Sequence, residues 1–275
     1  MFIFAIPLRA KSTTKDWNKC TRLFNATIKS IFNQENGNFK CIVACNDIPK
    51  LTESYDSRLQ FIKMDLPAPK NWLEMARDKY WKLTAIAVES RKILEKQKNP
   101  EDGIYVMPVD ADDLLNNKIV GYCEEHPNEN GFVSKDGYVW YSQESKLRIY
   151  KHLYEFCGSC NVIKMYREDL PEKMPYDDLY CHDGEIAKIL NKRYPIRLDH
   201  NEVVKKYAEI KKPFEELPFR STIYVLETGD NISSIYKKEH SNDNNKERFH
   251  PVAFIKNIYT TRIFTKSIKD EFGLL

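Results

Sequence analysis

The sequence has no long apolar run and no strong excess of charge of either sign. No window reaches the roughly 18 apolar residues that a membrane-spanning helix needs. The first residues, Phe2–Leu8, are apolar, but no basic region precedes them and Arg9 ends them, so we expect no signal peptide. The formal net charge is only +3, which gives no indication of a nucleic-acid partner. These absences predict a cytoplasmic protein, with peripheral association at the inner face of a membrane as an open alternative.

A disulfide framework is also missing, because the seven cysteines are odd in number and irregularly spaced. Cys41 and Cys45 lie within an apolar run, as buried free thiols do, which favours a reducing compartment. Cys157-Gly-Ser-Cys160, with Cys181-His182 downstream, lacks the second pair spacing of a strong zinc site. Zinc is therefore a minor alternative.

The first half of the 275 residues alternates between strand and helix patterns. We expect strands at Phe2–Leu8, Phe39–Cys45, Leu59–Met64 and Ile104–Val109, and helices at Asp16–Asn33 and Asn71–Lys98. Short connections between such elements imply parallel strands with right-handed crossovers. The sequence therefore predicts an α/β fold with a mostly parallel sheet flanked by helices.

The pattern changes in the second half, and no internal repeat is present. We expect partly antiparallel extended segments at Gly131–Trp140 and Leu147–Tyr154, a helix at Leu179–Leu190, and a strand at Thr222–Leu226. Residues 201–275 combine apolar stretches with the polar run Lys237–Glu247. We interpret them as a C-terminal extension that packs on the same domain and covers its cleft or forms a subunit contact.

The most informative stretch is Ile104–Val109 followed by Asp110-Ala111-Asp112-Asp113. Asp110 and Asp112 would point the same way from the carboxyl end of a buried strand, where open α/β sheets bind ligands. Carboxylate oxygens suit Mn²⁺ or Mg²⁺, and these ions usually bring a phosphate group. The alternative is that Asp112 and Asp113 cap a helix beginning at Leu114.

Pro108 is unusual within a central strand, because proline removes a backbone donor from the sheet. Either the strand is locally irregular, or the nitrogen of Pro108 faces a side that has no pairing partner.

Four segments together carry a family resemblance. They are Pro7-Leu8-Arg9 at a strand end, the helical stretch Thr27-Ile-Lys-Ser30-Ile-Phe-Asn-Gln34, the strand Phe39–Cys45 ending at Asn46, and Val109-Asp110-Ala-Asp112-Asp113. This series resembles the nucleotide-sugar half of a GT-A fold glycosyltransferase, nearest the family-2-like bacterial enzymes. The helix is similar to their TLxSIxxQ helix, and Asp110-Ala-Asp112 is similar to their DxD motif.

Segments downstream resemble the acceptor side of a bacterial subgroup: Gly131-Phe-Val, Gly137-Tyr-Val-Trp and Gly158-Ser-Cys-Asn161-Val-Ile. The resemblance covers about residues 2–200. It implies a GT-A catalytic domain over residues 1–200, with a nucleotide-sugar half at 1–115 and an acceptor half at 116–200.

The resemblance also implies roles for individual residues. The residues that would surround the nucleotide sugar are Pro7, Leu8, Arg9, Asn46 or Asp47, Lys82, Asp110 and Ala111. Asp112, together with Asp110, would bind the Mn²⁺ or Mg²⁺ that bridges the diphosphate. From the residues alone, Lys79 and Lys82 are interpreted as part of a solvated basic face, with a diphosphate contact as the alternative.

A catalytic base is expected where the family has a Glu-Asp pair at the start of a helix. This chain has Tyr180-Cys-His182-Asp183-Gly-Glu185 at the matching place. We predict Asp183 as the base, with Glu185 second and His182 as a metal ligand or orienting partner. The alternative is that Asp183 and Glu185 only satisfy the helix N-terminus.

The sequence thus predicts a metal-dependent glycosyltransferase that moves a sugar, with inversion, from a nucleoside diphosphate, preferably UDP, to a glycan hydroxyl. The acceptor would be a bacterial surface glycan or its lipid-linked precursor, so the process would be polysaccharide biosynthesis. A homo-oligomer is one possible state of the protein. A retaining GT-A enzyme is the nearest alternative. A sugar nucleotidyltransferase normally needs a glycine-rich phosphate loop, and Leu8-Arg9-Ala-Lys11-Ser12 has no glycine. A non-catalytic nucleotide-binding module is the third alternative.

Overall fold

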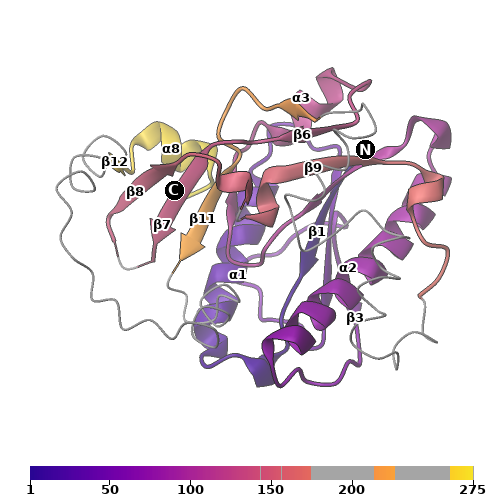
Figure 1. Cartoon of the computed structure of the whole chain (residues 1–275), viewed down its shortest axis with the longest axis horizontal. Helices are drawn as coiled ribbons and strands as arrows, with labels where there is room; N and C mark the ends of the chain where they lie inside the picture. Colours follow the sequence, from indigo (N-terminus) through magenta and orange to yellow (C-terminus); the bar gives the residue numbers. More distant parts are fainter. Residues whose placement is uncertain (143, 156, 175–213, 227–260, 275) are drawn as a thin grey trace.

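A computed structural model describes residues 1–142, 144–155, 157–174, 214–226 and 261–274. Over these ranges the protein is a mixed α/β structure with two sheets and four α-helices (Figure 1). None of these four helices is long and apolar enough to cross a membrane. The α/β class agrees with the prediction from sequence.

Sheet A is the larger sheet and has the strand order β10-β6-β9-β4-β1-β2-β3. Its strands are β1 (Phe2–Pro7), β2 (Phe39–Cys45), β3 (Leu59–Lys63), β4 (Ile104–Pro108), β6 (Gly131–Val133), β9 (Asn161–Met165) and β10 (Glu215–Glu216). The first four are parallel, as predicted from the short strand–helix–strand connections. The sheet as a whole is mixed, because β9 runs antiparallel to both β4 and β6.

Helices α1 (Trp17–Phe32) and α2 (Trp72–Glu95) cover opposite faces of sheet A. Each begins at a side-chain cap: Asp16 accepts a hydrogen bond from the backbone N–H of Lys19 at 2.9 Å, and Asn71 accepts one from Glu74 at 2.9 Å. Side chains alternate along a strand, so β1 supplies both faces. Its even-numbered residues pack with α1 and its odd-numbered residues with α2.

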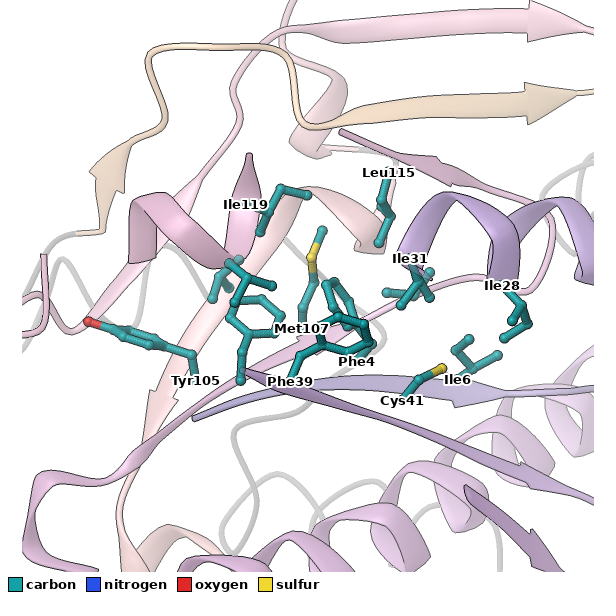
Figure 2. Packing of buried hydrophobic residues seen from close by; sticks show 14 of the residues in the cluster. Phe4, Ile6, Ile28, Ile31, Phe39, Cys41, Tyr105, Met107, Leu115 and Ile119 are labelled. Carbon is teal, nitrogen blue, oxygen red and sulfur yellow. The ribbon is translucent and has the colours of Figure 1, made fainter. Parts of the chain in front are cut away.

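The α1 face of sheet A carries the main apolar core (Figure 2). Phe4 from β1, Phe39 from β2 and Met107 from β4 are fully or almost fully buried there. Ile28 and Ile31 of α1 and Ile119 of α3 (Ile119–Glu125) pack against them, also without exposed surface. This burial fixes α1 and α3 relative to the strands of sheet A.

Pro108 fits β4 because of the direction in which its nitrogen points. The backbone nitrogens of Tyr105 and Val109 donate to β1, so that of the intervening even-numbered Pro108 faces β9. The pairing of β4 with β9 ends at Val106, two residues earlier. Of the two explanations offered for this proline, the nitrogen on an unpaired side is correct.

Sheet B has the order β12-β8-β7-β11-β5. Its strands are β5 (Leu114–Leu115), β7 (Gly137–Tyr141), β8 (Lys146–Tyr150), β11 (Thr222–Leu226) and β12 (Thr261–Ile263), with α8 (Lys266–Glu271) alongside (Figure 1). Because β5 directly follows Asp113, the alternative that Asp112 and Asp113 cap a helix beginning at Leu114 is wrong. The helix in this region, α3, begins only at Ile119.

The end of the chain packs into the fold through α8 and Phe272. The Phe272 side chain is fully buried beside Leu114, Ile223 and Val225 of sheet B. The side chain of Asn33, at the end of α1, donates to the backbone oxygen of Asp270 at 2.7 Å. The described C-terminal residues therefore help to build the core beneath sheet B.

We expect Phe272→Ala to lower the free energy of unfolding by about 3–5 kcal/mol, because it removes a fully buried aromatic ring and leaves a cavity. Urea unfolding followed by circular dichroism measures this change. Ile263→Ala is the control: its side chain is 65% exposed on β12, so the change should stay below about 1 kcal/mol. Equal losses in the two variants would contradict the placement of the C-terminus.

Candidate functional site

The candidate site lies where the parallel strands of sheet A end. Arg9 follows β1, Asn46 and Asp47 follow β2, and Asp110 follows β4. The first half of α2 runs along the same edge and contributes Lys79, which pairs with Asp110, and Lys82, which pairs with Asp78. In α/β proteins with parallel strands, ligands bind at this carboxyl edge.

Asp110 is held from two sides. Its carboxylate forms an ion pair with the Lys79 ammonium group of α2, and its backbone N–H donates to Ser159 Oγ at 2.9 Å. Burial acts to lower the pKa of Lys79, but the negative charges of Asp110 and Asp113 outweigh burial and raise it. Lys79 is therefore a charged partner that neutralises Asp110 in this structure.

Asp113 is fully buried, although its side chain is acidic. Its carboxylate accepts hydrogen bonds from Ser159 Oγ at 2.6 Å, from Cys157 Sγ at 3.3 Å and from the backbone N–H of Val225 at 3.2 Å. Burial raises the pKa of Asp113 well above its usual range, and the negative charges of Asp112 and Asp110 act in the same direction.

Ser159 links the two aspartates. Its hydroxyl donates to Asp113 and accepts from the backbone N–H of Asp110, so both residues are positioned by one side chain. Ser159 belongs to a short 3₁₀ turn, η4 (Gly158–Cys160), which is buried and precedes β9. The Gly158-Ser-Cys-Asn161 segment thus lies against the Asp110–Asp113 turn.

Asp110 and Asp112, whose carboxylates are of the kind that suits a hard cation, lie in a turn closed by a hydrogen bond from the Asp113 backbone N–H to the backbone oxygen of Asp110 at 3.1 Å. Both are partly exposed, whereas Ala111 between them packs against the main core. In the described ranges no group of three His, Cys, Asp or Glu residues is arranged to hold a metal ion. Two carboxylates nevertheless fit Mg²⁺ or Mn²⁺, because such ions often take only one or two protein carboxylates and complete their shell with water and phosphate.

Lys82 and Asp78 form a second ion pair, deep beside the strand ends. The two side chains are 2.6 Å apart, and Lys82 has no exposed surface. Burial raises the pKa of Asp78 and lowers that of Lys82, which shows that desolvation opposes the charged forms of both. The interpretation of Lys79 and Lys82 as a solvated basic face is therefore wrong.

A cavity of about 290 Å³ opens at the ends of β2 and β3. It is lined by Lys11, Trp17, Asn46, Asp47, Ile48 and Lys63. Trp17 and Ile48 give it apolar walls, whereas the two lysines supply positive charge. Asp47 accepts a hydrogen bond from the Lys11 backbone N–H at 2.9 Å, and the amide of Asn46 donates to Leu66 O at 2.8 Å.

Three of the residues predicted to surround the nucleotide sugar, Pro7, Leu8 and Arg9, lie at this edge. Leu8 is only 1% exposed and packs in the main core, and Arg9 donates to the backbone oxygen of Thr13 at 2.7 Å. Pro7 is the last residue of β1. The predicted catalytic residues His182, Asp183 and Glu185 lie outside the described residues.

Sequence reasoning missed several residues that the fold brings to this edge. Trp17, Ile48 and Lys63 come from three separate segments, and no local pattern connects them. In the sequence, Cys157 and Ser159 stand out only as parts of the segment Cys157-Gly-Ser-Cys160. Their contact with Asp113 depends on the turn before β9, which the sequence pattern does not specify. A search for polar residues directly after predicted strands finds Asn46, Asp47 and Asp110 but not these partners.

No protein-family model matches this sequence, and no curated protein matches it either. The groups that the structure brings to this edge are carboxylates, the paired ammonium groups of Lys79 and Lys82, and a cavity with both polar and apolar side chains in its wall.

The raised pKa of Asp113 predicts a dependence of stability on pH. The folded state binds the proton of the Asp113 carboxyl group more tightly than the unfolded chain does, in which an aspartate has a pKa of about 3.9. As the pH rises above that value, the wild type should lose stability relative to Asp113→Asn by up to about 1.4 kcal/mol per pH unit, until the folded pKa is passed. Urea unfolding of both proteins over a pH series measures this difference.

Asp56→Asn is the control for that experiment. Hydrogen bonds from Arg58 lower the pKa of the exposed Asp56, so this residue contributes stability above the unfolded pKa and loses it as the pH falls. The stability difference between the wild type and Asp113→Asn and the difference between the wild type and Asp56→Asn should therefore change with pH in opposite directions. A pH-independent difference for Asp113→Asn would contradict the account of its buried carboxylate.

Proposed function

We propose that this protein is a metal-dependent glycosyltransferase of GT-A fold that takes its sugar from a nucleoside diphosphate donor, preferably UDP-linked. The observation that carries the proposal is the position of Asp110-Ala-Asp112 at the carboxyl end of β4, beside Lys79 of α2. Carboxylates there hold a divalent cation, and a neighbouring ammonium group favours the diphosphate that such a cation binds.

The cavity near β2 and β3 supports binding of the nucleotide at the same edge. β2 lies two strands from β4, a separation of about 10 Å. One extended nucleotide reaches across that distance, with its base between Trp17 and Ile48 and its diphosphate near Asp112. Asn46 and Asp47 offer polar groups for the base or ribose, in agreement with the family resemblance.

The strand arrangement is also consistent with the GT-A proposal. With parallel strands in the order β3-β2-β1-β4 and antiparallel β9 next, the proposed nucleotide half and acceptor half would lie on the two sides of Asp110. The segment before β9 contacts Asp110 and Asp113 directly. An acceptor-side segment next to the metal-binding carboxylates is what sugar transfer requires.

When bound at Asp110 and Asp112, Mn²⁺ or Mg²⁺ would neutralise the negative charge of the departing diphosphate. The protein would position the donor through the strand ends and α2. In the inverting reaction the acceptor oxygen forms a bond to the anomeric carbon, the bond from that carbon to the diphosphate oxygen breaks, and Asp183 takes the hydroxyl proton. The acceptor would be a bacterial surface glycan or its lipid-linked precursor, and the reaction would take place in the cytoplasm.

The alternatives rest on specific observations. A retaining GT-A enzyme would use the same carboxylates without a base at Asp183. A nucleotidyltransferase is less well supported, because the segment after β1 forms a short 3₁₀ turn, η1 (Lys11–Thr13), with no glycine to approach a phosphate. A non-catalytic module would bind the nucleotide independently of metal.

We predict that Asp112→Asn abolishes Mn²⁺-dependent binding of UDP while leaving the fold intact. The variant removes one of two charged oxygen donors, but the residue is partly exposed and outside the core. Isothermal titration calorimetry with UDP, in Mn²⁺ and in EDTA, measures the effect. The control Asp56→Asn removes an exposed carboxylate away from the edge and should bind like the wild type. Equal affinity of the wild type in EDTA and in Mn²⁺ would contradict the metal role.

We predict that Asp183→Asn lowers turnover by about 10²-fold or more while UDP affinity stays unchanged, because the base acts only on the acceptor hydroxyl. Transfer and hydrolysis of radiolabelled UDP-sugars measure turnover. Glu185→Gln is the comparison, with a smaller expected effect. Near-normal turnover of Asp183→Asn would transfer the role to Glu185 or favour the retaining mechanism.

A further inference from the structure

Asn161, the first residue of β9, has a buried amide that makes no hydrogen bond to the residues that the structure describes. The residue is 3% exposed, and neither its Nδ2 nor its Oδ1 atom has a partner within the described part of the chain. Asn25 shows the usual situation. Its Nδ2 donates to Thr21 O at 2.8 Å and to Lys50 O at 3.0 Å, and its Oδ1 accepts from Thr52 N at 2.8 Å. Buried polar atoms without partners are rare and indicate a ligand, a water molecule or a functional role.

The sheet register places Asn161 next to the carboxylate site. The pairing of β4 with β9 ends where Val106 meets Ile163, and continuing that register by two residues brings Asn161 level with Pro108. Two residues further along, Ser159 is level with Asp110, in agreement with the 2.9 Å hydrogen bond from the Asp110 backbone N–H to Ser159 Oγ. In this register Asn161 and Asp110 are diagonal neighbours, and such residues on adjacent strands lie about 7–8 Å apart.

Asn161 and Asp110 also share a face of sheet A. Ile163 and Met165 pack on the α2 face, and alternation along β9 places Asn161 on the same face. On β4, the even-numbered residues face α2, and Asp110 continues that side because it pairs with Lys79 of α2. The unpartnered amide is therefore directed to the side where the carboxylates and the lysine meet.

The chemistry of the amide restricts its ligand. Nδ2 only donates and Oδ1 only accepts, so a phosphate would leave the oxygen unpaired and a cation would leave the nitrogen unpaired. A pair of neighbouring sugar hydroxyls satisfies both atoms, because each hydroxyl donates and accepts. The nucleobase cavity lies beyond β1, on the opposite side of β4 from β9. A sugar attached to the far end of the diphosphate would therefore lie toward Asn161.

We infer that Asn161 binds two neighbouring hydroxyl groups of the donor's sugar and so helps to select which sugar is transferred. This inference rests on the proposed function, since it places the sugar by the diphosphate at Asp110. The amide is enclosed in this structure, so binding includes a local opening of the side chains around it. Asn161 is a specificity residue and takes no part in proton transfer.

Asn161→Leu tests the inference, because leucine has a similar shape and cannot hydrogen-bond. The probes are UDP-glucose, UDP-galactose, UDP-N-acetylglucosamine and GDP-mannose, each compared with its parent nucleotide in Mn²⁺ by calorimetry. For the sugar nucleotide that the wild type binds best, the dissociation constant should rise at least about tenfold in the variant. The constant for the parent nucleotide should stay within about twofold.

Thermal unfolding of the ligand-free proteins gives a second measurement, with Asn25→Leu as the matched control. Asn25→Leu loses four hydrogen bonds and should unfold at a lower temperature. Asn161→Leu loses none and should unfold at the wild-type temperature or above. If leucine prevents folding, Asn161→Ser, which is smaller, is used for the binding comparison.

The outcomes separate the inference from the proposed function. Equal effects of Asn161→Leu on the sugar nucleotide and on the parent nucleotide would overturn the inference and leave the glycosyltransferase proposal intact. A change in Asn161→Leu that is confined to the KM of the acceptor would also overturn the inference and leave the glycosyltransferase proposal intact. A wild type that binds none of the four donors nor their parent nucleotides would contradict the proposed function itself, and the inference with it.

Discussion

Asp113 lies where the chain leaves sheet A and enters sheet B, and its buried carboxylate is bonded to both parts. Ser159 and Cys157 donate to it from the segment before β9 of sheet A, and the backbone N–H of Val225 donates from β11 of sheet B. Because an unpaired buried carboxylate is strongly unfavourable, these donors must stay in place for the fold to persist. The same bonds position Asp110 through Ser159, so the geometry of the candidate site depends on the junction of the sheets.

Charge along the carboxyl edge of sheet A is balanced pair by pair. Lys79 neutralises Asp110, and Lys82 neutralises Asp78. The first pair is partly exposed, whereas the second is buried, so the two respond differently to a ligand. A cation at Asp110 would release Lys79 toward an anion, while Lys82 and Asp78 stay fixed. In the proposed enzyme this exchange would couple binding of the metal to binding of the diphosphate.

The sequence predicted those parts of the fold that local periodicity specifies. The bounds of β2 and β11 agree with the prediction, and those of β1, β3, β4, α1 and α2 differ by at most a few residues, because alternation and helical spacing are local. The pairing of β5 with β11 and the hydrogen bond from Val225 to Asp113 were not foreseen, since they join residues more than 100 positions apart. Lys82 was misjudged for a related reason: its burial depends on the strand ends beneath α2, not on its neighbours in sequence.

The most direct test of the central claim is a crystal structure with Mn²⁺ and UDP, in which anomalous scattering locates the metal. The account predicts a manganese peak within about 2.0–2.6 Å of carboxylate oxygens of Asp110 or Asp112, a typical range for oxygen ligands of divalent cations. It also predicts that the Lys79 ammonium group has left Asp110 and that the uracil lies between Trp17 and Ile48. Metal and nucleotide bound instead at the opposite edge of sheet A, in the cavity lined by Met1, Asn38, Gln97, Lys98, Asn99 and Asp102, would contradict the account.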